Sequence, residues 1–316
     1  METIRRTVFV WVAVLYIVTS LSLSCKPALG GEVAAWGSNN YGQCDVPANN
    51  DFVAVAAGGY HSLALRADGS LAAWGDNTYG QCNVPSGNDF VAIACGGFHC
   101  IATRSDGSLA AWGWNSSGQC NAPAGNDFIT VDGGGYHSLA IKSDGTLAAW
   151  GDNAYGQCSV PSGDNFIAII GDFYHSRAIK SDGSGVVWGW NRYHQSQPVP
   201  NSEYAMIVDG GHHTLAIRYD GSLAAWGWNN YHQCDVPAGG DFVAVARGGY
   251  HSLALKTEGS QATWDLNKQE HGDMPIANEF IGLARGWRYS LAVVREPITL
   301  VLLGLGGATL LKKRRG

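Results

Sequence analysis

Seven copies of one 38-residue unit fill the middle of this chain, and this repeat limits the folds open to it. Three kinds of residue recur at the same constant step. The tryptophans are Trp36, Trp74, Trp112, Trp150, Trp188, Trp226 and Trp264. The histidines are His61, His99, His137, His175, His213 and His251, with Tyr289 in the seventh place. The third series is Phe52, Phe90, Phe128, Phe166, Tyr204, Phe242 and Phe280. A repeat of this length indicates a solenoid, a propeller or an array.

The pattern inside one unit predicts short strands. Residues 52–56 and 61–66 alternate in the manner of half-buried strands, and Asp68-Gly69 is a strong hairpin signal. Residues 70–75 form a third predicted strand, and residues 81–84 a short fourth one. The unit has no helical period. Three or four strands in a repeat of this length are typical of a propeller blade.

The ends of the repeat predict how the ring closes. The series starts inside a unit, with the strand that holds Trp36, and stops inside one, after residues 289–293. The last blade therefore lacks a third strand of its own. Residues 32–37 can supply it, which would leave no open sheet edge. We predict an all-β, seven-bladed propeller over residues 31–294, closed by its N-terminal strand.

Residues 1–30 have the three parts of a secretory signal peptide. A basic start is followed by an apolar run over residues 7–23 and by small residues at the −3 and −1 positions before Gly31. The predicted mature chain begins at Gly31. A lipoprotein acylated at Cys25 is an alternative, although the expected aliphatic residue three positions earlier is missing. An uncleaved N-terminal anchor is another.

Residues 295–316 have the same three parts in reverse order. Glu296 and Pro297 precede an apolar stretch at 298–311, and a basic tail follows. The apolar stretch spans about 21 Å as a helix, which is shorter than a bilayer core. The segment resembles a PEP-CTERM sorting signal, with an arginine in place of the first proline. The resemblance implies recognition by a membrane exosortase outside the cytoplasm. A plain membrane anchor is the alternative.

The repeat motifs themselves resemble a known family. Gly-Gly-Tyr-His-Ser-Leu-Ala-Leu (58–65), Asp-Gly-Ser-Leu-Ala-Ala-Trp-Gly (68–75) and Asn-x-Tyr-Gly-Gln (77–81) are similar to the regulator of chromosome condensation repeat. That resemblance, over residues 33–294, implies a seven-bladed propeller. The short form Gly-Gln-Cys-Asp-Val-Pro (42–47) is more similar to secreted bacterial members, among them a β-lactamase-inhibitory protein. The founding nuclear protein's nucleotide-exchange role is not expected in an exported chain.

Charge argues against a nucleic-acid partner. The two terminal segments hold eight of the 20 basic residues and two of the 26 acidic ones. Residues 31–294 therefore carry 12 basic and 24 acidic side chains, a net charge of −12. Phosphate backbones are bound by basic surfaces, so we expect no nucleic acid and a neutral or cationic partner instead.

The repeat histidines and aspartates are expected to have structural roles. Each histidine occupies the same place in a different blade, whereas a zinc site needs four converging ligands. We therefore expect buried structural imidazoles and neither metal nor cofactor. One aspartate series stands in hairpin turns and is predicted to serve turn chemistry rather than calcium, which takes 6–8 oxygens. Its members are Asp68, Asp106, Asp144, Asp182 and Asp220.

The cysteines fall into two groups. Five share one register and are predicted to be small buried apolar residues: Cys44, Cys82, Cys120, Cys158 and Cys234. Cys95 and Cys100 instead flank a turn on two strands of one hairpin. Export to an oxidising compartment permits a disulfide between them, and free thiols are the alternative.

The aromatic residues that follow each Trp-Gly pair are the candidate ligand-binding residues. They are Trp114, Trp190 and Trp228 in one register, and Tyr79, Tyr155, Tyr193 and Tyr231 in another. These loops should share one face, where aromatic clusters suit protein contacts or sugar stacking. The alternative is that the rings fold back over the blade edges.

The sequence contains no nucleophile elbow, phosphate loop or zinc-protease motif. We therefore expect an exported, envelope-associated, monomeric scaffold that binds a protein or a polysaccharide and is not an enzyme. One alternative is an inhibitor of a secreted enzyme such as a β-lactamase. A weaker one is a hydrolase or lyase on a propeller scaffold.

Overall fold

The computed structural model describes residues 32–48, 51–192, 204–210, 212–247, 252–258, 260–264, 280–287 and 289–294. These residues form seven three-stranded antiparallel sheets, and no helix occurs among them. The all-β propeller prediction is confirmed. The predicted signal peptide, the sorting motif at Glu296 and Pro297, the apolar stretch at 298–311 and Tyr193 lie outside the described residues. Within the described part of the chain, no helix has the length and apolar character needed to cross a bilayer.

Each sheet is one blade, made of an inner, a middle and an outer strand. Blade 1 contains β2 (Phe52–Ala57), β3 (His61–Arg66) and β4 (Leu71–Gly75). Blade 2 contains β5 (Phe90–Cys95), β6 (His99–Arg104) and β7 (Leu109–Gly113). Blade 3 contains β8 (Phe128–Gly133), β9 (His137–Lys142) and β10 (Leu147–Gly151). Blade 4 contains β11 (Phe166–Gly171), β12 (His175–Lys180) and β13 (Gly185–Gly189). Blade 5 contains β14 (Tyr204–Gly210), β15 (His213–Arg218) and β16 (Leu223–Gly227). Blade 6 contains β17 (Phe242–Arg247), β18 (Ser252–Lys256) and β19 (Gln261–Trp264). Blade 7 contains β20 (Phe280–Arg285), β21 (Tyr289–Val294) and β1 (Glu32–Gly37).

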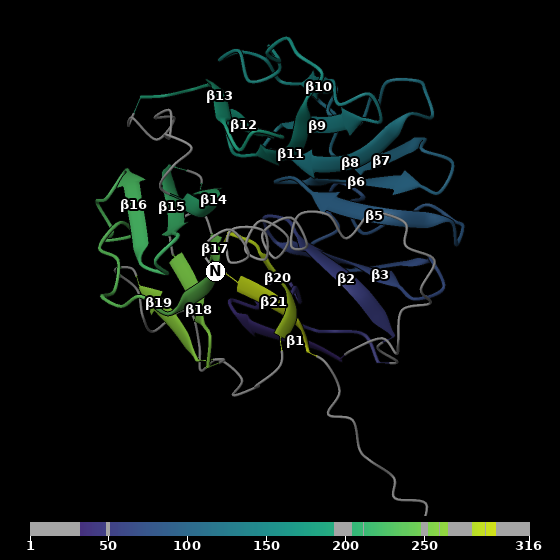
Figure 1. The fold of residues 1–316 in the computed structure, drawn as a ribbon. Coiled ribbons are helices and arrows are strands. Elements are labelled where there is room, and N and C mark those ends of the chain that lie inside the picture. The colour runs from purple at the N-terminus through teal and green to yellow at the C-terminus, as the bar shows by residue number, and fades with distance from the viewer. Residues whose placement is uncertain are drawn as a thin grey trace, which may run out of the picture.

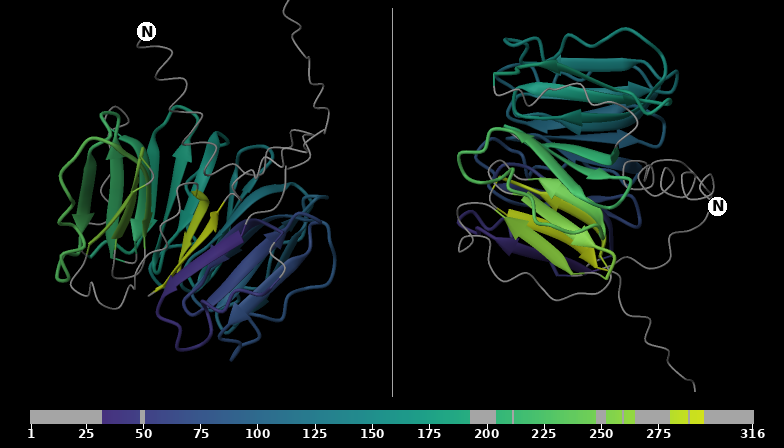
Figure 2. Two further views of the ribbon diagram at one scale, coloured as in Figure 1. Left: turned by 90° about the horizontal axis from the view of Figure 1, so that it is seen from below. Right: turned by 60° about the vertical axis from the view of Figure 1, so that its left-hand side comes forward.

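The blades stand in a closed ring (Figure 1). The inner strand of each blade contacts the inner strand of the next, in the order β2, β5, β8, β11, β14, β17 and β20, and β20 contacts β2 again. The views in Figure 2 show the blades side by side around the ring. Because every inner strand has a neighbour on both sides, each blade buries both of its faces.

The first described strand completes the last blade, as the sequence predicts. β1 pairs with β21 in antiparallel register, with Val33 opposite Val293 and Trp36 opposite Ser290. In Figure 1 the purple strand β1 lies beside the yellow strand β21. The chain thus closes the ring with hydrogen bonds between its two ends.

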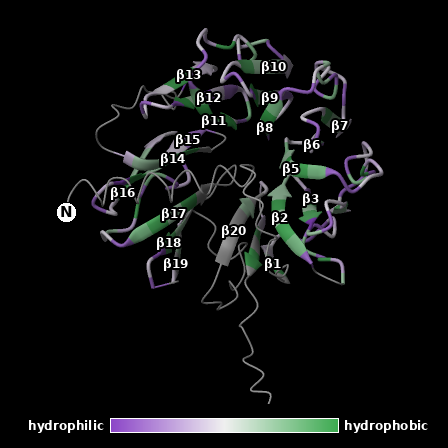
Figure 3. Ribbon diagram, turned by 45° about the vertical axis from the view of Figure 1, so that its right-hand side comes forward, coloured by the Kyte–Doolittle hydropathy of each residue, from purple (hydrophilic) through white to green (hydrophobic). Residues whose placement is uncertain are grey.

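The hydrophobic core lies between neighbouring blades. One cluster joins Phe52 and Trp74 of blade 1 to Val33, Leu291 and Val293 of blade 7. Equivalent clusters fill other blade interfaces. Figure 3 shows the apolar colour along the strands and the polar colour along the outer loops. Because side chains alternate between the two faces of each strand, every blade contributes to the interfaces on both of its sides.

The predicted fourth strand at residues 81–84 is wrong. The backbone there bonds within its own loop: Cys82 N–H donates to Asn77 Oδ1 at 2.9 Å, and Asn83 N–H donates to the Gly80 carbonyl at 3.0 Å. Val84 N–H donates to the Cys82 carbonyl at 3.0 Å. These donors are used up locally, so the segment cannot pair with an outer strand.

The Asp-Gly hairpin turns match the prediction. Asp68 Oδ1 accepts hydrogen bonds from the backbone N–H and the hydroxyl of Ser70, at 2.8 and 2.7 Å. These bonds lower the pKa of Asp68. Gly69 has a φ of 85°, and a Cβ there would lie 2.2 Å from the Asn88 carbonyl oxygen. Glycine is required at this position for both reasons.

Candidate functional site

One face of the ring gathers two sets of loops. In blade 1, Gly75 at the end of β4 lies opposite His61 at the start of β3. The loop that leaves β4 therefore begins at the same edge as the turn between β2 and β3. The other blades repeat this register. We call this edge of the ring the aromatic face, because both sets of loops carry aromatic side chains there.

The aromatic side chains of the two sets pack against each other. Tyr79 and Trp114, from two successive outer-strand loops, stack with ring centroids 5.3 Å apart and an interplanar angle of 22°. Phe98, from the turn of blade 2, lies edge-on to both, at 5.7 and 5.4 Å. The same arrangement recurs two blades on, where Tyr174 meets Tyr155 at 5.3 Å and Trp190 at 5.7 Å. Each turn ring is thus held between loop rings.

Trp287 connects blades that are not neighbours. It comes from the turn of blade 7 and meets Tyr60 of blade 1 at 5.0 Å, Phe98 of blade 2 at 5.1 Å and Phe173 of blade 4 at 5.3 Å. A Cβ on Gly59 would lie 3.1 Å from the Trp287 ring. The glycines of these turns therefore leave the space that the central rings occupy.

The chain of ring contacts continues into blade 5. His212 lies between Trp190 and Trp228, at 5.5 and 5.3 Å, and Trp228 meets Tyr231 at 5.0 Å. Burial lowers the pKa of His212, although the carboxylate of Asp172 opposes this. The imidazole acts here as one more ring of the face.

These rings remain accessible at the surface. Tyr79 and Tyr155 are 48% and 52% exposed, and Tyr231 is 38% exposed, whereas Trp114 and Trp190 are half-buried. The loop rings pack on one another and still face solvent, and their predicted role in ligand binding stays a prediction. The sequence analysis missed a set of residues that complete the face: Tyr60, Phe98, Tyr136, Phe173, Tyr174, His212 and Trp287. For five of them the available signal was the ring that recurs directly before the repeat histidine. Phe173 and Trp287 instead stand where other copies have the second turn glycine, such as Gly59.

Beneath this face, the repeat histidines link the blades. His99 Nε2 lies 2.9 Å from Ser138 Oγ of the next blade, and that hydroxyl donates to the Gln119 carbonyl at 2.8 Å. Trp150 Nε1–H donates to the same carbonyl at 2.8 Å. The hydroxyl proton is used by the carbonyl, so the imidazole N–H must donate to the serine. His137 repeats the pattern with Ser176, as does His213 with Ser252. The prediction of structural imidazoles is confirmed at these positions.

Burial has a large effect on these imidazoles. It lowers the pKa of His99 to about 3, with a smaller contribution from His137. It lowers the pKa of His137 to about 3 as well. Both side chains are therefore neutral in the folded protein near neutral pH.

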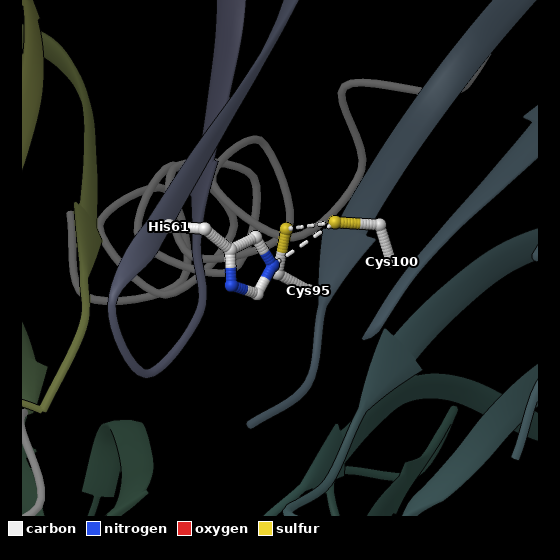
Figure 4. Close-up of side chains that lie close together, drawn as sticks. All are labelled: His61, Cys95 and Cys100. Atoms are coloured by element: carbon white, nitrogen blue, oxygen red, sulfur yellow. Dashed lines mark hydrogen bonds between the residues drawn. The ribbon is translucent and has the colours of Figure 1, made fainter. Parts of the chain in front are cut away.

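The link between blades 1 and 2 differs from the others because a cysteine replaces the serine. His61 Nε2 lies 3.1 Å from Cys100 Sγ, and Cys95 Sγ lies 3.0 Å from the same sulfur (Figure 4). Cys95 and Cys100 stand directly opposite each other on β5 and β6. Both are free thiols in the structure, and the disulfide stays a prediction.

The pKa values of the two thiols in this cluster shift in opposite directions. Burial acts to raise the pKa of Cys95, but hydrogen bonds from Cys100 and His61 outweigh it and lower the pKa to about 6. Burial and the neighbouring Cys95 raise the pKa of Cys100 well above its usual range. Of the two thiols, Cys95 therefore loses its proton more readily than Cys100.

The thiols of the loop cysteines are much less acidic than the thiol of Cys95. Cys82 Sγ donates to the Asp76 carbonyl at 3.2 Å, and Cys158 Sγ donates to the Asp152 carbonyl at 3.1 Å. Burial raises the pKa of both thiols to about 12. The prediction of buried apolar side chains is wrong for this register, because these cysteines are half-buried and their thiols donate to loop carbonyls.

Comparison with known proteins agrees with this architecture. Residues 52–81, 90–119, 128–157 and 210–233 match the profile described as "Regulator of chromosome condensation (RCC1) repeat". Among curated proteins, no sequence resembles the chain at a significant level.

Solved structures share the fold at low sequence identity. Yeast RCC1 (Prp20), crystallised bound to Kap60, is 17% identical, with a TM-score of 0.73 over 90% of this chain and 92% of the other. A second structure of Saccharomyces cerevisiae Prp20p, described with its binding to Gsp1p and histones, is 16% identical, with a TM-score of 0.72 over 88% and 93%. The ectodomain of the Physcomitrella patens receptor kinase CR4 is 22% identical, with a TM-score of 0.61 over 73% and 65%. Four segments of the chain thus match the RCC1 repeat profile, and its fold is similar to that of RCC1-like propellers.

Proposed function

We propose that this RCC1-like propeller is a non-catalytic scaffold that binds a protein partner through its aromatic face. The observation that carries the proposal is the continuous chain of ring contacts that runs from blade 7 through blades 1 to 5. Aromatic residues dominate the energetic centres of protein interfaces, because they bury large areas with few rotatable bonds. Rings that already support one another lose little conformational freedom when a partner covers them.

The structural neighbours support a protein partner. Yeast RCC1 was crystallised with Kap60, and Prp20p is described with binding to Gsp1p and histones. Those partners belong to those proteins. What carries over to this chain is the use of an RCC1-like propeller as a platform for another protein.

The chemistry of the aromatic face favours binding over catalysis. Its rings are those of tyrosine, phenylalanine and tryptophan, apart from His212, which is packed between Trp190 and Trp228. The repeat histidines beneath it, such as His99, are fully buried and hydrogen-bonded into the framework between blades. General acid–base catalysis needs a titratable group within reach of a substrate, whereas these imidazoles are buried and hydrogen-bonded between the blades.

Charge favours a neutral or basic partner. Residues 31–294 carry a net charge of −12. At the opposite edge of the ring, several basic side chains pair with aspartates: Arg66 with Asp51, Arg104 with Asp89, Lys142 with Asp127, and Lys256 with Asp241. These cations are already neutralised, so the propeller is poorly suited to phosphate backbones.

We further propose that the protein is exported and held at the cell envelope. The support is the signal-peptide pattern of residues 1–30 and the PEP-CTERM resemblance of residues 295–316. Intact mass of the protein isolated from its own cells tests both ends. A mass that begins at Gly31 and lacks the basic tail is the expected result, and an unprocessed chain would contradict it.

The binding proposal is tested by capture from envelope and extracellular fractions, followed by affinity measurement with the captured partner. Trp114→Ala and Tyr155→Ala should each weaken binding at least about tenfold, as expected for interface centres. Tyr219→Ala is the matched control, because Tyr219 is 45% exposed at the opposite edge, next to the Asp-Gly turn of blade 5. Equal losses for all three variants would contradict the proposal. Capture of polysaccharide alone would replace the protein partner with a sugar that stacks on the rings.

Inhibition of a secreted enzyme is a second candidate function. It is favoured by the short Gly-Gln-x-x-Val-Pro form of the repeats, for example at residues 42–47. Titration against β-lactamases tests it directly. Inhibition that is lost in Trp114→Ala would support it, and full enzyme activity at saturating propeller would exclude it.

A further inference from the structure

One blade interface carries a pair of thiols that the other copies lack. Where blade 2 has Cys100, the other copies have Ser62, Ser138, Ser176, Thr214, Ser252 and Ser290. Where it has Cys95, they have Ala57, Gly133, Gly171, Asp209, Arg247 and Arg285. The seven-fold pattern makes the departure clear, because the fold is built six times with neither sulfur.

The replacement of serine by cysteine in blade 2 weakens the hydrogen bonding between blades at this point. Ser138 Oγ donates to the Gln119 carbonyl at 2.8 Å, whereas Cys100 Sγ is 3.7 Å from the equivalent Gln81 carbonyl. A thiol is also a weaker donor than a hydroxyl. Packing between blades therefore gives no reason to prefer cysteine here.

Three ligand-type atoms converge at this interface. His61 Nε2, Cys95 Sγ and Cys100 Sγ all lie within 4.8 Å of one another. They come from three strands of two blades, β3, β5 and β6, whose positions are fixed by the sheets. Figure 4 shows the three side chains together; His61 and Cys100 are fully buried, and Cys95 is the least buried of the three.

We propose that His61, Cys95 and Cys100 bind one monovalent copper ion. Thiolate ligands select soft metals, of which Cu(I) and zinc are the common ones. A structural zinc site takes four protein ligands, and a zinc site with three protein ligands keeps its fourth position open for water or substrate. Among the described residues, no fourth histidine, cysteine or carboxylate joins the cluster. Three ligands without a fourth favour Cu(I), which is stable at lower coordination numbers.

The two sulfur atoms need to move only a short distance to bind one ion together. Metal–sulfur bonds of about 2.3 Å in a trigonal plane place the two sulfurs about 4 Å apart. They are 3.0 Å apart in the structure, so the sulfurs must separate by about 1 Å. A rotation of the Cys95 side chain is the movement that the proposal requires, since Cys95 is the less buried of the two cysteines.

Binding also changes the protonation of the cluster. Metal ions are bound by thiolates and by a neutral imidazole, so the cysteines must lose their protons on binding. Cu(I) displaces the thiol protons of Cys95 and Cys100 to solvent, and the His61 imidazole binds through Nε2 with its single proton on Nδ1. The site then carries two thiolates, one neutral imidazole and one monovalent cation.

The test is a titration of the reduced, full-length protein with Cu(I) in competition with a coloured Cu(I) chelator. One ion per chain is expected, together with ultraviolet charge-transfer absorption from sulfur to copper. Cys100→Ser and Cys95→Ala should each lower the affinity at least about 100-fold. Both variants install residues that other blades already carry, so both are expected to fold. Cys120→Ala, which removes a loop cysteine, is the matched control and should bind like the wild type.

Three results would overturn the proposal. They are Cu(I) binding by Cys100→Ser that equals the wild type, one-to-one binding of zinc without Cu(I), and isolation of the native protein with a Cys95–Cys100 disulfide that binds no Cu(I) after reduction. The circular dichroism of each variant shows that a loss of binding is not a loss of fold. The outcome is independent of the aromatic face, because partner binding there uses none of these three residues.

Discussion

Val33 lies directly opposite Val293 in an antiparallel ladder that joins the first and last described strands of the chain. Both side chains are buried, at 8% and 1% exposure, in the core between blades 7 and 1. The ring is thus held shut by backbone hydrogen bonds and by apolar contacts between opposite ends of the sequence. The stability of the propeller should depend on this short segment.

Removal of the closing strand should destabilise the whole ring. Deletion of residues 31–37 removes the ladder to β21 and exposes an edge of blade 7. Trp36→Ala, a milder change in the same strand, should lower the free energy of unfolding by about 3–5 kcal/mol, since Trp36 is 93% removed from solvent. Urea unfolding followed by circular dichroism measures both. A deletion variant as stable as the wild type would show that β1 does not close the ring.

Trp287→Ala should loosen the centre of the aromatic face. The indole makes edge-to-face contacts with Tyr60 and Phe98, each worth about 0.5–1.5 kcal/mol beyond simple burial. The expected loss of unfolding free energy is therefore about 1–3 kcal/mol. Trp287→Phe keeps an aromatic ring and is the control, with a smaller loss. If alanine and phenylalanine behave alike, ring contacts do not stabilise the face.

Acid should destabilise the fold well above the pH at which carboxylates titrate. The pKa of His99 and of His137 is about 3 in the folded protein, and their ordinary value is 6.5. Between these values the unfolded chain binds protons that the folded chain excludes, so stability falls as the pH falls below about 6.5. Each histidine contributes roughly 1.4 kcal/mol per pH unit over this range. Urea midpoints at pH 7, 6 and 5 measure the slope, and His137→Gln should reduce it. Equal stability at pH 7 and pH 5 would contradict the buried neutral imidazoles.

Arg177 and Gly185 form a compensating pair in blade 4. Arg177 is fully buried where other blades have Leu63, Ile101, Leu139 and Leu215, and Gly185 stands where they have Leu71, Leu109, Leu147 and Leu223. A Cβ on Gly185 would lie 3.6 Å from Arg177 Nη1. A Cβ alone would therefore fit at van der Waals distance, whereas the longer side chain of a leucine would compete with the guanidinium for space.

A double-mutant cycle tests this pairing. Gly185→Leu alone should overpack the blade and cost about 1–3 kcal/mol. The combination Arg177→Leu with Gly185→Leu restores the pair of leucines used elsewhere, and should recover that loss with a coupling energy of about 1–3 kcal/mol. Additive effects of the two substitutions would show that the positions are independent.

The sequence by itself determined the blades, the ring and its closure. The constant step of Trp36, Trp74 and their successors fixes one strand pattern in every copy, and a sheet that must bury two faces has few ways to stack seven times. The Asp-Gly turns followed from local chemistry, since Asp68 accepts its hydrogen bonds from Ser70, two residues later. The predicted strand at 81–84 was wrong because its backbone donors are satisfied within its own loop. The alternation of side chains does not reveal those local hydrogen bonds.

The sites were decided by the tertiary structure. Tyr79, Trp114 and Phe98 belong to different sequence registers, and only the return of each outer strand to the edge of its middle strand brings them together. His61 and Cys100 likewise belong to different blades and meet because neighbouring blades pack their middle strands at one level. A repeat pattern specifies what each copy contains. It does not specify which residues of successive copies come into contact, since that depends on the angle and spacing at which the blades pack.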